Sequence, residues 1–217
     1  YGMEKKMSKF RITIRGSLLA VSALLVGFVV ILTTSSALDA WRQMSNARLV
    51  QANNHTADLF LESAANWAAE RGITNAALAS WDAATPEQRK AIDQRRATST
   101  KAFEEALAEL EKEPDFPGKS ELVAKLQAAY QNVVELRGRV DADLAKSKIE
   151  RDAEVTKIWV PTMTGLIMTS QHLRQVSQFR SETIETQIQM LSDLKQALWV
   201  MSEYAGRERA VIGGILS

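Results

Sequence analysis

One predicted helix carries four polar or aromatic residues at spacings of three and four: Trp67, Glu70, Arg71 and Thr74. Residues at these spacings cover adjacent surface on an α-helix. The guanidinium of Arg71 indicates the chemistry, because an arginine fork donates two parallel hydrogen bonds to a small planar oxyanion and stays charged at physiological pH. The chemistry that we expect is therefore recognition of an anion.

A similar segment recurs near the C-terminus, where Tyr204, Glu208 and Arg209 lie together around Gly206. If the two segments pack side by side, two guanidinium groups converge between helices. An anion that completes the pair would favour that arrangement, because differential affinity shifts a two-state equilibrium. We predict one ligand-binding group from the two segments: Arg71, Arg209, Glu70, Trp67, Thr74 and Arg207.

The same residues also allow a purely structural interpretation. Glu203 and Arg207 stand at positions i and i+4 in the favoured order, which is common for surface ion pairs worth about 0.3–0.5 kcal/mol. Glu70 and Arg71 would then only pair with neighbouring helices. The spacing is compatible with both interpretations.

Helices must position these residues, because the spacing of apolar residues is helical throughout the chain after residue 38. Apolar residues step by four and three from Leu122 to Leu144 and again from Ile184 to Met201. Thr85-Pro86 and Gln88 form a capping-box pattern, Ser120 is placed to cap a helix, and Pro161 either kinks a helix or starts one. We predict an all-α chain of antiparallel helical bundles, with helices over residues 17–82, 86–112, 120–158, 162–180 and 184–217.

Residues 16–38 carry no charge and follow a basic N-terminal segment. As a helix they reach roughly 34 Å, enough to cross a bilayer core of about 30 Å. Basic residues beside a span tend to stay in the cytoplasm. We predict a cytoplasmic segment over 1–15, a transmembrane helix over 16–38 that continues outward as a helix, and a periplasmic domain over 39–217.

A cleaved signal peptide is the alternative, because Ser35-Ser36-Ala37 matches a small-residue cleavage site. The length of the uncharged stretch favours the anchor, and both interpretations export the domain.

Composition narrows the function. The net charge is +1, so no bulk field attracts nucleic acid. Cysteine is absent, which excludes disulfides and thiolate chemistry. The two histidines, His55 and His172, have no metal-ligand spacing, and no grouping of serine, histidine and acid suggests hydrolysis. We expect no metal, no cofactor and no enzymatic activity.

Three short motifs resemble the nitrate- and nitrite-sensing (NIT) domain family: Glu-Arg-Gly-Ile-Thr at 70–74, Gln-Arg-Arg-Ala-Thr at 94–98 and Gly-Arg-Glu-Arg-Ala at 206–210. The resemblance covers roughly residues 55–217. It implies an all-helical fold with two four-helix bundles, as in the extracytoplasmic part of bacterial chemotaxis receptors, histidine kinases and cyclic-nucleotide enzymes. Arg71 and Arg209 are the positions that it implies for a ligand.

The resemblance implies the sensing region of a receptor in the bacterial inner membrane, of the chemotaxis type, for a small anion such as nitrate or nitrite. Members commonly continue into a second transmembrane helix and a cytoplasmic output domain. We therefore expect this chain to be a truncated domain with incomplete bundles. We expect its cytoplasmic signalling partners to bind to a region that is not present here. Such helical receptors usually act as homodimers. The alternative function is a membrane-anchored scaffold that joins a partner helix through the stripe from Leu122 to Leu144.

Overall fold

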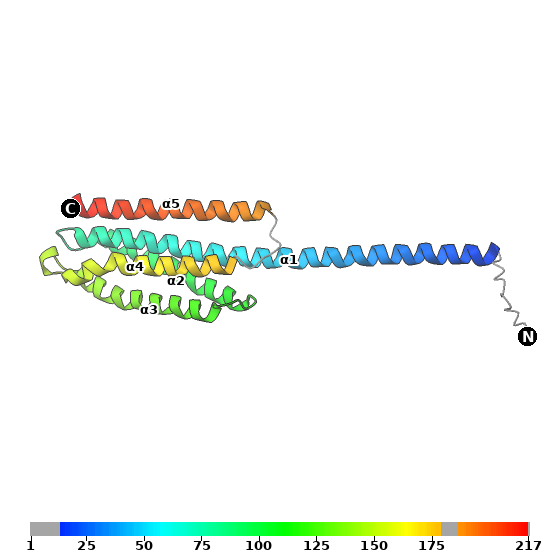
Figure 1. Ribbon diagram of the computed structural model, residues 1–217. Helices are drawn as coiled ribbons and strands as arrows, with labels where there is room; N and C mark the ends of the chain where they lie inside the picture. The colour runs from blue at the N-terminus through cyan, green and yellow to red at the C-terminus, as the bar shows by residue number, and fades with distance from the viewer. Residues whose placement is uncertain (1–13, 179–185, 217) are drawn as a thin grey trace, which may run out of the picture. The chain divides into compact units, whose positions relative to one another are not determined.

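The computed structural model describes residues 14–178 and 186–216, without the side chains of residues 46, 186–189, 192 and 209–216. Every regular element in these ranges is a helix (Figure 1), which confirms the all-α prediction. The elements are α1 (Ile14–Ala79), α2 (Pro86–Lys112), α3 (Lys119–Asp143), the short 3₁₀ helix η1 (Lys148–Glu150), α4 (Ala153–Gln178) and α5 (Thr186–Leu216).

The chain divides into two compact units, Tyr1–Leu49 and Val50–Ser217. In the first unit, α1 contains an 18-residue window with a mean hydropathy of 2.4, none of it buried. Among the described residues this is the one helix long and apolar enough to cross a membrane. An N-terminal signal sequence has the same properties, so the anchor over residues 16–38 stays a prediction.

Hydroxyl side chains at the end of this apolar stretch are bonded within their own helix. Thr33 Oγ1 donates to Val29 O at 2.9 Å, and Thr34 Oγ1 donates to Val30 O at 2.7 Å. Ser35 Oγ donates to the carbonyl of Leu32 at 2.9 Å. Because lipid offers polar groups no partner, this bonding makes the hydroxyl residues compatible with a membrane.

The second unit is a helical bundle, in which α2, α3 and α4 run alongside the C-terminal part of α1 (Figure 1). Its core contains a ring cluster in which Trp67 meets Phe103 at 5.4 Å between centroids, and Phe103 meets Tyr130 at 4.6 Å. From the predicted stripe on α3, five residues are buried here: Leu126, Val133, Leu136, Val140 and Leu144. The stripe is therefore covered by this chain and is not free to join a partner helix.

The cap of α2 follows the prediction. Gln88 N donates to Thr85 Oγ1 at 3.2 Å, and Thr85 N donates to Gln88 Oε1 at 2.9 Å, with Pro86 as the first helical residue. The predicted cap at Ser120 is wrong. Helix α3 begins after Gly118, whose φ of 80° is readily adopted by glycine, and Ser120 lies inside the helix.

The predicted boundary between the third and fourth helices is also wrong. Helix α3 ends at Asp143 rather than near residue 158, and α4 runs from Ala153 through Pro161. The break comes earlier because Arg151 binds the carbonyls of Asp143 and Lys146 and so holds the chain out of a helix at this point. Pro161 neither ends α4 nor starts it.

Candidate functional site

Glu70 lies at the centre of a cluster of charges that extends from the core to the surface, here called the Glu70 cluster (Glu70, Arg96, Arg137 and Asp141). Its carboxylate is fully buried and accepts hydrogen bonds from Arg137 Nε at 2.9 Å, Arg137 Nη2 at 2.6 Å and Arg96 Nε at 2.7 Å. Arg96 also donates to Asp141 Oδ2 at 2.8 Å. Burial alone would lower the pKa of Arg96, but its hydrogen bonds to Asp141 and Glu70 hold that pKa above the ordinary value. Glu70 therefore ties α1 to α2 and α3.

Arg71 points to different helices and forms a second buried group, the Arg71 clasp (Arg71, Thr164, Glu203 and Arg207). Its Nη1 donates to Glu203 Oε1 at 2.7 Å and its Nη2 to Glu203 Oε2 at 3.1 Å. Nη1 also donates to Thr164 Oγ1 at 2.9 Å. The side chains of Arg71 and Glu203 are 1% and 3% exposed. The clasp thus joins α1 to α5 through one bidentate ion pair and α1 to α4 through the hydrogen bond to Thr164.

The guanidinium groups of Arg71 and Arg207 converge between α1 and α5, but on a carboxylate of the chain itself. Arg207 Nε donates to Glu203 Oε1 at 2.8 Å, the oxygen that also accepts from Arg71 Nη1. Gly206 lies beside them, because a Cβ there would be 3.7 Å from Arg71 Nη2. The prediction of an ion pair between Glu203 and Arg207 is confirmed, although Glu203 is buried rather than on the surface.

The stability of the clasp is expected to depend on pH through Glu203. Burial alone would raise the pKa of Glu203, but hydrogen bonds and positive charge from Arg71 and Arg207 hold it below its ordinary value. A carboxyl with a lowered pKa in the folded state stabilises that state above its unfolded pKa of about 4.3, and this is lost as the pH falls through the folded value. Between roughly pH 5 and pH 3, the free energy of unfolding of Glu203→Gln should therefore fall less than that of the wild type.

Urea midpoints of the full chain in mild detergent, followed by tryptophan fluorescence at several pH values, measure this dependence. Parallel curves for the wild type and Glu203→Gln would show that Glu203 contributes nothing to the acid sensitivity.

The remaining predicted residues occupy different places. Trp67 and Thr74 are fully buried, and neither the indole nitrogen of Trp67 nor Thr74 Oγ1 has a hydrogen-bond partner among the described residues. Arg207 is half-buried and also lies 5.4 Å from the ring centroid of Tyr204. Arg209 belongs to α5, but its side chain lies outside the described residues.

Arg174 is a buried arginine that the sequence reasoning missed. Its Nε donates to Gln171 Oε1 at 2.7 Å, its Nη1 donates to Gln178 Oε1 at 3.0 Å, and its Nη2 donates to Gln196 Oε1. Burial lowers its pKa to about 10, although the charge of Asp58 opposes this shift. A signal was present in the sequence, because Ser170, Gln171 and Arg174 put polar groups on the buried face of an otherwise amphipathic helix.

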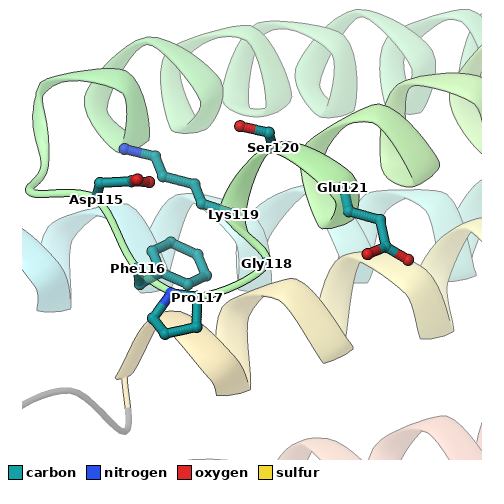
Figure 2. A pocket seen from close by; sticks show the side chains of 7 residues that line it. All are labelled: Asp115, Phe116, Pro117, Gly118, Lys119, Ser120 and Glu121. Atoms are coloured by element: carbon teal, nitrogen blue, oxygen red, sulfur yellow. The ribbon is translucent and has the colours of Figure 1, made fainter.

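A surface hollow lies elsewhere, at the turn between α2 and α3. Figure 2 shows its lining of Asp115–Glu121, with the rings of Phe116 and Pro117 below the side chain of Lys119. Lys119 Nζ donates to Glu113 O at 2.9 Å and so ties this turn together. None of the predicted ligand-binding residues lines the hollow.

Comparison with known proteins gives one family. Residues 62–217 match the family model described as nitrate and nitrite sensing. No curated protein and no solved structure matches the chain. The matched range includes the Glu70 cluster, the Arg71 clasp and Arg174.

Proposed function

The chain belongs to the nitrate and nitrite sensing family, and we propose that it is the ligand-sensing region of a bacterial transmembrane receptor of the chemotaxis type. Its sensing module indicates a small-molecule ligand, for which nitrate and nitrite are the candidates. The apolar part of α1 supports attachment to a membrane. The sequence, with no cysteine and two histidines, supports a binding role rather than an enzymatic one.

The proposal includes an orientation and partners. Lysines and arginines precede the apolar stretch, which favours a cytoplasmic N-terminus and a periplasmic sensing domain in the inner membrane. We propose that the receptor is a homodimer and that its cytoplasmic signalling partners bind outside the region described here.

The Arg71 clasp is the observation that carries the proposed mechanism. The carboxylate of Glu203 offers the fork of Arg71 two oxygens in one plane, and nitrate and nitrite offer the same arrangement. We propose that the anion competes with Glu203 for Arg71. The anion-bound state then loses the ion pair that joins α1 to α5. The equilibrium between the closed and the open clasp shifts by the difference in anion affinity between these two states.

Calorimetry of the full chain in mild detergent with sodium nitrate and sodium nitrite tests this mechanism. Glu203→Gln removes the competing charge, so we expect nitrate to bind at least about tenfold more tightly, equivalent to about 1.4 kcal/mol. Arg71→Gln should abolish measurable binding at this site. The matched control is Glu208→Gln, the same change at an exposed position of the same helix, which should leave the affinity unchanged.

An affinity that is equal in the wild type, Glu203→Gln and Arg71→Gln would mean that the clasp only holds the helices together. The absence of heat with both anions in all variants would overturn nitrate and nitrite as the ligands.

A further inference from the structure

Arg174 differs from the other buried arginines of the described residues in what its charge meets. Arg71 is paired with Glu203, and Arg137 with Glu70. Arg151 meets five main-chain carbonyls, several at helix ends where the macrodipole is negative. Arg174, only 1% exposed, meets side-chain amide oxygens, and no carboxylate of the described residues pairs with it.

A buried charge is normally paired, because removing it from water is costly. Nearby, Asp58 is engaged by Lys195, whose Nζ donates to Asp58 Oδ1 at 2.7 Å. The negative charge of Asp58 is therefore largely balanced by Lys195. Among the described residues, no acid therefore compensates the positive charge of Arg174, and a monovalent anion would match it.

Two more buried donors on α4 have no hydrogen-bond partner among the described residues. Ser170 is fully buried and its Oγ makes no hydrogen bond, and Gln171, 2% exposed, leaves its Nε2 unbonded. They precede Arg174 by four and three residues, so the three side chains share one face of α4. Gln171 Oε1 already accepts from Arg174 Nε, so the unbonded Nε2 belongs to an amide in direct contact with the guanidinium.

The other two glutamines bound to Arg174 are less buried than Arg174 itself. Gln178 and Gln196, which occupy Nη1 and Nη2, are half-buried. A rotation of either side chain toward solvent would free an edge of the guanidinium. A neutral amide oxygen is also a weaker partner for this charge than an anion, because an anion adds the attraction between opposite charges to the hydrogen bond.

We propose that Arg174, Gln171 and Ser170 form an anion-binding site between α4 and α5, separate from the Arg71 clasp, for a small planar monovalent oxyanion. The guanidinium binds one edge of the anion in place of the amide oxygens of Gln178 and Gln196. The amide of Gln171 and the hydroxyl of Ser170 donate to the remaining oxygen. The choice of nitrate and nitrite as ligands rests on the proposed function, whereas the site itself rests on these side chains.

Thermal unfolding of the full chain in mild detergent tests the site, with sodium nitrate, nitrite or formate against sodium sulfate at the same ionic strength. Nitrate should raise the unfolding temperature of the wild type. Arg174→Gln should unfold at a higher temperature than the wild type without nitrate, since an unpaired buried charge is removed, and its nitrate affinity should fall at least tenfold. The double variant Arg71→Gln/Glu203→Gln should keep the nitrate response, and the exposed control Arg139→Gln should behave as the wild type.

Ser170→Ala is a milder second variant, because the hydroxyl that it removes has no hydrogen-bond partner in the described part of the chain. It should unfold at the wild-type temperature without nitrate and bind nitrate about threefold more weakly. A nitrate response that survives unchanged in Arg174→Gln and Ser170→Ala would overturn the site and leave the proposed function standing. A lower unfolding temperature of Arg174→Gln without nitrate, together with an unchanged Ser170→Ala, would also overturn it, since Arg174 would then be structural.

The two proposals can fail separately. If formate stabilises the wild type through Arg174 while nitrate and nitrite do not, the site is supported and the nitrate-sensing function is overturned. If no planar anion stabilises the wild type, both proposals are overturned.

Discussion

Replacing Arg151 with alanine is expected to lower the free energy of unfolding by at least about 3 kcal/mol, since hydrogen bonds to charged groups contribute roughly 1.5–3 kcal/mol each and are not additive. The guanidinium donates to five main-chain carbonyls. The bonds reach Ser80 O and Asp82 O at 2.6 Å, Leu78 O at 2.8 Å, Lys146 O at 2.9 Å and Asp143 O at 3.2 Å. Arg151 therefore holds the end of α1 against the connection between α3 and α4.

The position of Arg151 explains why its loss is costly. These carbonyls lie at or just beyond the ends of α1 and α3, where helices leave carbonyl groups without partners. Arg151 is 9% exposed, so water would not fully replace the lost donors. Arg151→Lys should be nearly as destabilising as the alanine variant, because an ammonium has three donors instead of a planar set of five.

Urea unfolding of the full chain in mild detergent measures both variants. Arg139→Ala is the matched control, because Arg139 is half exposed and pairs with Asp152, also half exposed, at 3.1 Å. Exposed pairs contribute little, so this variant should unfold close to the wild type. If Arg151→Lys proved as stable as the wild type, three donors would suffice, and the five hydrogen bonds of Arg151 to main-chain carbonyls would not be needed for stability.

Glu70→Ala is expected to cost about 3–5 kcal/mol, the range for removing one partner of a buried ion pair. The carboxylate is fully buried and accepts two hydrogen bonds from Arg137. Its loss leaves the guanidinium of Arg137 without its carboxylate partner, although this side chain is only 10% exposed. Arg96 keeps its bond to Asp141, so most of the cost arises at Arg137.

The matched control for Glu70 is Asp93→Ala, which removes an exposed carboxylate 4.0 Å from the same Arg96. It should leave the urea midpoint nearly unchanged. The double variant Glu70→Leu/Arg137→Met should recover much of the loss, because replacing both members of a buried pair by apolar residues is often neutral. A midpoint for Glu70→Ala close to that of Asp93→Ala would show that Glu70 does not hold α1 to α3.

Local patterns in the sequence were enough to predict the helical fold. The periodic spacing of apolar residues predicted that the chain is helical. Thr85 and Gln88 predicted the N-terminal cap of α2, because this kind of cap depends on residues three positions apart. Helix α3 ends where Arg151 binds the carbonyls of Asp143 and Lys146, and the same guanidinium also binds Leu78 O, 73 positions away. No local spacing reveals such a contact, and Pro161 therefore looked like the stronger boundary.

The candidate site divides in the same way. The grouping of Glu70 with Arg71 was visible as helical neighbours, but the two residues pair with different helices. Glu203 looked like the partner of Arg207 alone, because its bond to Arg71 joins positions 132 apart. Arg174 was missed because its lack of a carboxylate partner among the described residues is a property of the packed bundle rather than of its sequence neighbours.

The indole of Trp159 gives the protein a built-in optical probe of the Arg71 clasp. Trp159 is fully buried, and its Nε1 donates to the main-chain carbonyl of Arg71 at 3.2 Å. A chain in which Trp41, Trp67, Trp81 and Trp199 are replaced by phenylalanine would emit from Trp159 alone. Its emission wavelength would then follow, without any added label, how the backbone at Arg71 responds when that side chain exchanges one partner for another.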